Sequence, residues 1–95
     1  MLYVSAITEI ELLSFSQLDK ESEIQIRFFL DDENCRLVEL ISAIKEQTIK
    51  IRKRHRIKLP DAVIAATAIF LGIPLLTFDS GFVKIDNLDV ILLEL

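Results

Sequence analysis

The sequence has little of the residues that build disulfide-linked or unstructured proteins. Its 95 residues include one cysteine, two glycines, two prolines and no tryptophan. The single cysteine, Cys35, cannot form an internal disulfide, which excludes a small disulfide-stapled scaffold. The scarcity of glycine and proline excludes collagen-like and low-complexity architectures.

Long hydrophobic runs and targeting signals are also lacking. The longest apolar stretch, from Ala62 to Leu71, is interrupted by Thr67 and is too short to span a bilayer. The first residues lack the basic, apolar and small-residue blocks of a signal peptide. We therefore expect a cytoplasmic protein with no membrane segment.

What the sequence does contain is a balanced mixture of apolar and charged residues. Apolar residues make up 52% and charged residues 27%, a balance that excludes intrinsic disorder. Eleven basic and fifteen acidic residues give a net charge of −4, which argues against generalised nucleic-acid binding. The length predicts one domain, spanning residues 1–95.

Strand-like and helix-like segments alternate along this domain. The expected strands are residues 1–6, 35–39, 75–78 and 90–93, and the expected helices start near Thr8, Asp19, Leu40 and Pro60. The first helix start rests on Thr8 and Glu11, which match a capping box. The last two strands show no polar alternation, so we expect both of their faces to be covered. Alternating strands and helices predict an α/β fold with a parallel sheet.

Three acidic residues occupy positions where parallel sheets form sites. Glu11 is expected in the first turn of the helix after the first strand, Asp61 in the first turn of the apolar helix, and Asp79 directly after a strand. Clustered carboxylates need a cation to neutralise their repulsion, and hard oxygen ligands favour Mg²⁺ or Mn²⁺. Such ions activate water for phosphodiester hydrolysis.

Each acid also has a structural explanation. Glu11 is the capping-box partner of Thr8, Asp61 suits the helix dipole, and Asp79 can cap a turn with Ser80 and Gly81. If all three acids are only caps, the chain is an α/β interaction module with no metal site.

Three segments resemble the PIN-domain family, above all the VapC-like ribonuclease toxins of type II toxin–antitoxin pairs. They are VSAITEIELLS (residues 4–14), KLPDAVIAATA (58–68) and PLLTFDSGF (74–82), in the family's order. The closing IDNLDVILLEL resembles the family's last strand. The resemblance implies a PIN-like parallel sheet sandwiched by helices.

The resemblance also implies a function. Glu11, Asp61 and Asp79 match acids that bind Mg²⁺ or Mn²⁺ in the family and hydrolyse RNA. Thr77 matches a hydroxyl residue near the metal, so we expect it to support the site. Family membership further implies an antitoxin partner, which would bind the early helices.

The chain departs from the family pattern at its beginning. The family's first strand, which ends in a further metal-binding aspartate, and its first helix have no counterpart here. In the family's strand order, 3-2-1-4-5, that strand is central, so we expect two half-sheets with unpaired inner edges. We expect these edges to cause self-association by domain swapping or strand pairing.

With three of four acids, we expect weak metal affinity and slow or absent RNA cleavage. The alternative is a non-catalytic PIN-like remnant that self-associates or binds partners.

A run of basic residues leads into Asp61. It comprises Lys50, Arg52, Lys53, Arg54, Arg56 and Lys58. The run is either an RNA phosphate-binding patch or a solvated helix end whose cations complement the dipole. The resemblance favours RNA binding by Arg52, Lys53, Arg54, Arg56 and Lys58. We interpret His55 as a packing residue, since no nucleophile or second histidine accompanies it.

Overall fold

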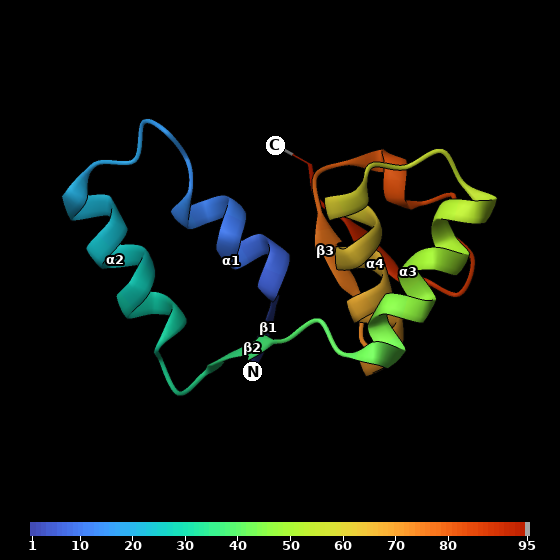
Figure 1. The fold of residues 1–95 in the computed structure, drawn as a ribbon, viewed down its shortest axis with the longest axis horizontal. Helices are drawn as coiled ribbons and strands as arrows, with labels where there is room; N and C mark the ends of the chain where they lie inside the picture. The colour runs from blue at the N-terminus through green and yellow to red at the C-terminus, as the bar shows by residue number, and fades with distance from the viewer. Residues whose placement is uncertain (95) are drawn as a thin grey trace. The chain divides into compact units, whose positions relative to one another are not determined.

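The computed structural model describes residues 1–94 and divides into two compact units. The first unit spans Met1–Leu40 and the second begins at Ile41 (Figure 1). None of the described helices has the length and apolar content needed to cross a membrane.

The first unit contains two strands joined by two helices. Its elements are β1 (Leu2–Ser5), α1 (Ala6–Leu13), α2 (Lys20–Leu30) and β2 (Cys35–Val38). The two strands pair in parallel, with Leu2 opposite Cys35 and Ser5 opposite Val38. The predicted parallel α/β arrangement is therefore present in this unit.

Both helices of the first unit begin at a side-chain cap. The Ser5 hydroxyl accepts a hydrogen bond from the Ile7 N–H at 3.2 Å, so α1 starts at Ala6. The capping box expected at Thr8 and Glu11 is therefore wrong, because the helix has already begun at that point. The Asp19 carboxylate caps α2 by accepting from the Ser22 N–H at 2.6 Å, and this bond lowers the pKa of Asp19 below its ordinary value.

The core of the first unit is thin. Leu30 is its only buried apolar side chain, and α1 contains no buried residue. Several large apolar side chains of the two helices and their connection are exposed, among them Phe28, which is 78% exposed; the others are Ile10, Leu12, Phe15, Ile24 and Phe29. This unit therefore presents apolar surface that its own elements do not cover.

The second unit begins with a helical hairpin and ends with two strands. Its elements are α3 (Ser42–Arg54), α4 (Leu59–Leu71), β3 (Leu75–Thr77), the short 3₁₀ turn η1 (Ser80–Phe82) and β4 (Val90–Leu92). The bounds of α4 follow the predicted signals. Pro60 lies in its first turn, and Gly72 ends it in the left-handed conformation at φ 67°.

The core of the second unit lies where α3 packs on α4. Alanines on α4 allow the two helices to approach closely, and Ile44 of α3 is completely buried. Two buried threonines satisfy their hydroxyls within their own helices: Thr48 donates to the Ile44 carbonyl at 2.8 Å and Thr67 to the Val63 carbonyl at 2.7 Å. This unit is thus better packed than the first.

Each unit contains its own two-stranded sheet. β3 pairs with β4 in parallel, with Leu75 opposite Val90, just as β1 pairs with β2. The expectation of two half-sheets is confirmed, since among the described residues every strand has one partner and one open edge. The expectation that β3 and β4 are covered on both faces is wrong: Leu76 is 59% exposed, and its cross-strand neighbour Ile91, on the same face, is exposed as well. The elements of the unit do not cover that face.

Candidate metal centre and basic segment

Asp61 is held at the start of the most deeply buried helix. It lies in the first turn of α4 and is half-buried, and the next residue, Ala62, is completely buried and fixes the backbone beside it. No described residue donates a hydrogen bond to its carboxylate. The helix dipole favours a negative charge here, so the structural explanation for Asp61 fits its position. Its oxygens are also free to bind a cation.

Asp79 sits in the turn after β3 and performs the capping role that the sequence suggests. One of its oxygens, Oδ1, accepts from the Gly81 N–H at 2.8 Å and caps η1. The Thr77 hydroxyl accepts from the Asp79 N–H at 3.1 Å, so this side chain fixes the backbone of the turn. The second carboxylate oxygen, Oδ2, has no hydrogen bond from the described residues and faces solvent with the rest of the exposed residue.

Glu11 lies in the second half of α1 and not in its first turn. The helix starts at Ala6 and ends at Leu13, and the Glu11 side chain is exposed. No described residue forms a hydrogen bond or ion pair with it. The capping explanation for Glu11 is therefore removed, whereas the metal-binding explanation stays a prediction.

The three acids belong to different units. Asp61 and Asp79 are in the second unit and Glu11 is in the first. Within the described residues of each unit, no three His, Cys, Asp or Glu side chains form a group that could hold a metal ion. The donors themselves fit Mg²⁺ or Mn²⁺ in chemical type, because all three offer carboxylate oxygens.

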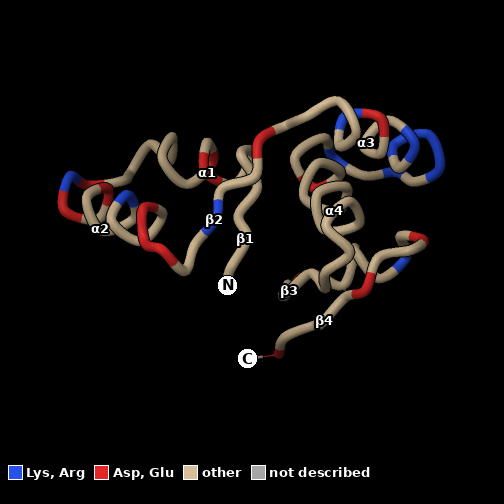
Figure 2. Tube along the Cα trace, turned by 90° about the horizontal axis from the view of Figure 1, so that it is seen from below, with Lys and Arg blue, Asp and Glu red and all other residues tan. Residues whose placement is uncertain are grey.

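The basic segment surrounds the end of α3. Arg52, Lys53 and Arg54 form the last turn, and Arg56 and Lys58 follow in the loop before α4; all five side chains are exposed. Figure 2 shows the basic positions, in blue, gathered around this end of α3. The segment is tied to the loop after η1 at two points. The Lys84 ammonium donates to the Arg56 carbonyl at 3.1 Å, and the Arg54 guanidinium lies 3.7 Å from the Asp86 carboxylate.

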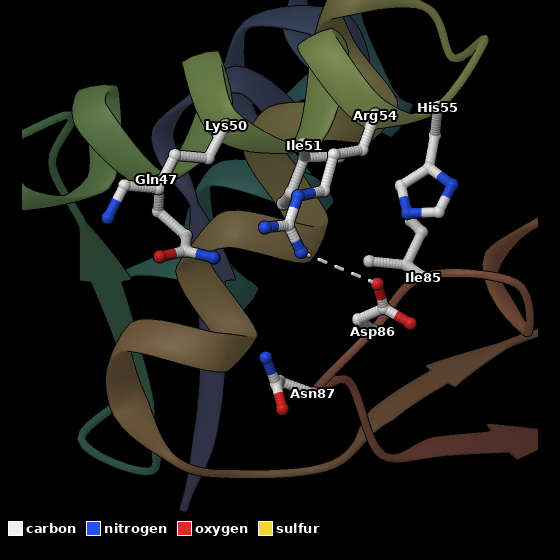
Figure 3. Close-up of a pocket in the computed structure, with 8 residues that line it drawn as sticks. All are labelled: Gln47, Lys50, Ile51, Arg54, His55, Ile85, Asp86 and Asn87. Carbon is white, nitrogen blue, oxygen red and sulfur yellow. Dashed lines mark ion pairs between the residues drawn. The ribbon is translucent and has the colours of Figure 1, made fainter.

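The sequence reasoning missed a pocket beside this segment. The pocket, about 240 Å³ in volume, lies between one side of α3 and residues 85–87 (Figure 3). Its lining residues are Gln47, Lys50, Ile51, Arg54, His55, Ile85, Asp86 and Asn87. His55, interpreted as a packing residue, is half-buried at the end of α3 and lines this pocket. The spacing of the α3 residues is a helix-face pattern, but no sequence signal pairs that face with residues 85–87.

These features agree with the comparison to known protein families. The profile described as "PIN domain" matches residues 1–88, nearly the whole chain. The chain therefore belongs to the PIN domain family. That membership excludes the alternative of an unrelated interaction module. PIN domains are in general divalent-metal-dependent nucleases.

Two solved structures contain chains that this chain resembles. It is similar to a chain of a toxin–antitoxin complex from Klebsiella pneumoniae, with 27% identity and a TM-score of 0.77, over 94% of this chain and 71% of that one. It is similar in fold to a chain of VapBC2 from Rickettsia felis, solved with a DNA fragment from its promoter, with 23% identity and a TM-score of 0.78, over 94% of this chain and 72% of that one. No curated protein matches the chain.

Proposed function

We propose that the chain is a Mg²⁺- or Mn²⁺-dependent endoribonuclease of the PIN type and the toxin of a toxin–antitoxin pair. The observation that carries this proposal is the family match over residues 1–88, joined by the likeness to toxin–antitoxin structures. The two units would then be parts of one PIN domain.

In this proposal Glu11, Asp61 and Asp79 hold the metal ion. Support comes from their carboxylates: neither Glu11 nor Asp61 has a hydrogen-bond partner among the described residues, and Asp79 keeps one oxygen free. A bound divalent ion activates water and stabilises the charge that develops on the phosphodiester. Thr77 keeps the Asp79 turn in place through the 3.1 Å hydrogen bond.

The RNA strand would lie along the basic segment. Arg52, Lys53, Arg54, Arg56 and Lys58 offer exposed cations just before the α4 turn that carries Asp61. Such cations raise the local concentration of an RNA strand although the chain carries a net charge of −4. A cytoplasmic location follows from an RNA substrate and an antitoxin partner.

The test is cleavage of a labelled RNA by the full chain, with Mg²⁺, with Mn²⁺ and with chelator. We expect slow metal-dependent cleavage that Asp61→Asn and Glu11→Gln each abolish. Asp89→Asn serves as the matched control, because Asp89 is exposed in the same unit as Asp61 and is no proposed ligand. Cleavage that continues in chelator, or that both ligand variants retain, would contradict the proposal.

The second candidate function is a non-catalytic, self-associating or partner-binding module. Two observations favour it: both sheets have an open edge, and the helices of the first unit leave large apolar side chains exposed. Open strand edges recruit other chains by adding a strand. Either function is therefore compatible with self-association, and only the second requires that no cleavage occurs.

Self-association is tested by light scattering against the 10.9 kDa mass of one chain. The Leu75 N–H donates to the Asp89 carbonyl at 2.8 Å, so by alternation the Leu76 N–H points to the open edge of β3. We expect Leu76→Pro to lower the measured mass, because proline removes that donor. Leu76→Val keeps the donor and serves as control. A clean monomer of the unmodified chain at micromolar concentration would refute the idea.

A further inference from the structure

The pocket beside α3 is built like a small-ligand site. Its floor is formed by Ile51 and Ile85, each only 4% exposed. Its rim carries side chains of four kinds: the cations of Lys50 and Arg54, the amides of Gln47 and Asn87, the acid of Asp86 and the imidazole of His55. Figure 3 shows Arg54 of α3 meeting Asp86 of the facing segment, with the Lys50 side chain extending away from this pair along one side of the pocket. Six of the eight lining side chains are polar or charged, so the pocket offers hydrogen-bond and ionic partners above a small apolar floor.

We propose that this pocket binds a single nucleotide of an RNA strand, with its base over the isoleucine floor and its phosphate at Lys50 and Arg54. The inference rests on the proposed RNA substrate and extends it to two residues outside the basic run, namely Gln47 and Asn87, and to Lys50 at its start. The site is separate from the carboxylates proposed to hold metal.

The size and polarity of the pocket suit a nucleotide. Its volume of about 240 Å³ is below the roughly 300 Å³ at which drug-sized sites begin, so a single planar base is an appropriate occupant. Amide side chains offer both donors and acceptors, as a base edge requires. An acidic peptide would use the cations but would leave the apolar floor and the amides without a role.

The ion pair at the rim is weak enough for a phosphate to replace it. The Arg54 and Asp86 groups are 3.7 Å apart, and their side chains are 73% and 66% exposed. Exposed pairs of this kind contribute little, and phosphate offers guanidinium a better bidentate partner. Asp86 therefore competes with the ligand for Arg54 and repels its charge. Removing the acid should strengthen binding, an effect that damage to the fold would not produce.

The backbone of Asn87 provides a clean way to remove one amide. Asn87 has a positive φ of 65°, a conformation that glycine adopts without strain. Asn87→Gly therefore deletes the side chain and preserves the backbone.

The experiment is a titration of the full chain, followed by amide chemical shifts, in chelator so that no metal site takes part. The probes are the four nucleoside 5′-monophosphates, ribose 5-phosphate, inorganic phosphate and a short poly-glutamate peptide. We expect at least one nucleotide to saturate the chain near a Kd of about 1 mM, with shifts at the lining residues. We expect Arg54→Gln and Lys50→Gln to weaken binding about threefold or more, and Asp86→Asn to strengthen it.

Matched controls separate the pocket from general charge. Lys45→Gln removes an exposed cation from the same helix outside both the pocket and the basic segment, and Asp89→Asn removes an acid beyond residues 85–87, so neither should change the affinity by more than a small factor. Asn87→Gly should weaken the binding of nucleotides and leave the binding of inorganic phosphate unchanged.

Three results would overturn the inference. They are the absence of saturable nucleotide binding, binding of inorganic phosphate or of the peptide as tight as that of the nucleotide, and a loss of affinity in Lys45→Gln as large as in Lys50→Gln. The outcome is independent of cleavage: Asp61→Asn should abolish cleavage and leave nucleotide binding intact. A chain that binds nucleotide without cleaving RNA therefore supports the pocket while contradicting the nuclease proposal.

Discussion

Substitutions of Asp79 can separate its structural role from its proposed metal-binding role. One oxygen accepts the Gly81 N–H at 2.8 Å, and the other has no hydrogen bond from the described residues. Asp79→Asn keeps a carbonyl oxygen for the turn and removes the charge. Asp79→Ala removes both the cap and the charge. The two variants should therefore behave alike toward metal and differently in stability without metal.

The magnitudes follow from the exposure of the turn. Loss of one exposed capping hydrogen bond should lower the free energy of unfolding by about 0.5–1 kcal/mol in Asp79→Ala. For a domain of this size, 1 kcal/mol shifts the Tm by roughly 4–8 °C, so we expect a decrease of about 2–8 °C. Asparagine caps as well as aspartate does, so Asp79→Asn should stay close to the unmodified chain.

Bound metal should add a second, larger difference in the free energy of unfolding between the unmodified chain and the two variants. An ion present at 100 times its Kd stabilises the folded state by about 2.7 kcal/mol. We expect this gain for the unmodified chain in Mg²⁺ or Mn²⁺, and its loss in both variants because each lacks the carboxylate.

The assay is thermal unfolding of the three proteins in chelator and in excess metal. The reasoning about the turn is refuted if Asp79→Asn loses as much stability in chelator as Asp79→Ala. The metal assignment is refuted if either variant gains as much stability from metal as the unmodified chain does.

Three further predictions concern stability. Ile44→Ala should lower the free energy of unfolding by about 2–5 kcal/mol, measured by denaturant unfolding, because this side chain is completely buried. Gly72→Ala should lower it by about 1–2 kcal/mol in the same measurement, entirely from the positive φ, because an added Cβ meets no atom within 4 Å. The pKa of Asp19 is lower in the folded chain than in the unfolded chain. The ionised Asp19 cap therefore stabilises the fold at pH values above its unfolded pKa, and this stabilisation is lost as the pH falls through its folded pKa. Asp19→Asn should remove this acid-dependent loss of helix, which circular dichroism measures.

The local sequence predicts α4 well and α1 less well. Pro60, the alanine-rich run and Gly72 define α4 without reference to any other segment. The start of α1 depends on Ser5, whose position at the end of β1 is set by pairing with Val38. Thr8 offers a second hydroxyl with a plausible cap pattern three residues further on. Only the strand pairing decides between these two hydroxyls, and it joins residues distant in the sequence.

In the candidate site, too, features that depend on neighbouring residues were predicted and features that depend on distant residues were not. Asp79 caps its turn as predicted, because its partner Gly81 is two residues away. The pocket was missed because its two sides come from α3 and from residues 85–87, which nothing in the sequence connects. The positive φ of Asn87, which orients one side of the rim, is likewise a property of the folded loop.

The two units use their apolar residues differently: the second unit buries many of them, and the first leaves many exposed. In the second unit, Ile44, Ile51 and the α4 alanines are buried by that unit's own helices. In the first unit, one fully buried leucine and several half-buried apolar side chains act against the conformational entropy of ordering the unit, which is about 1–2 kcal/mol for each backbone position. The exposed phenylalanines and isoleucines of that unit are therefore apolar surface whose burial against another chain would stabilise it. A second copy of the chain or an antitoxin would supply that cover, so we expect hydrogen exchange in α1 and α2 to slow when the chain associates and exchange in α4 to change little.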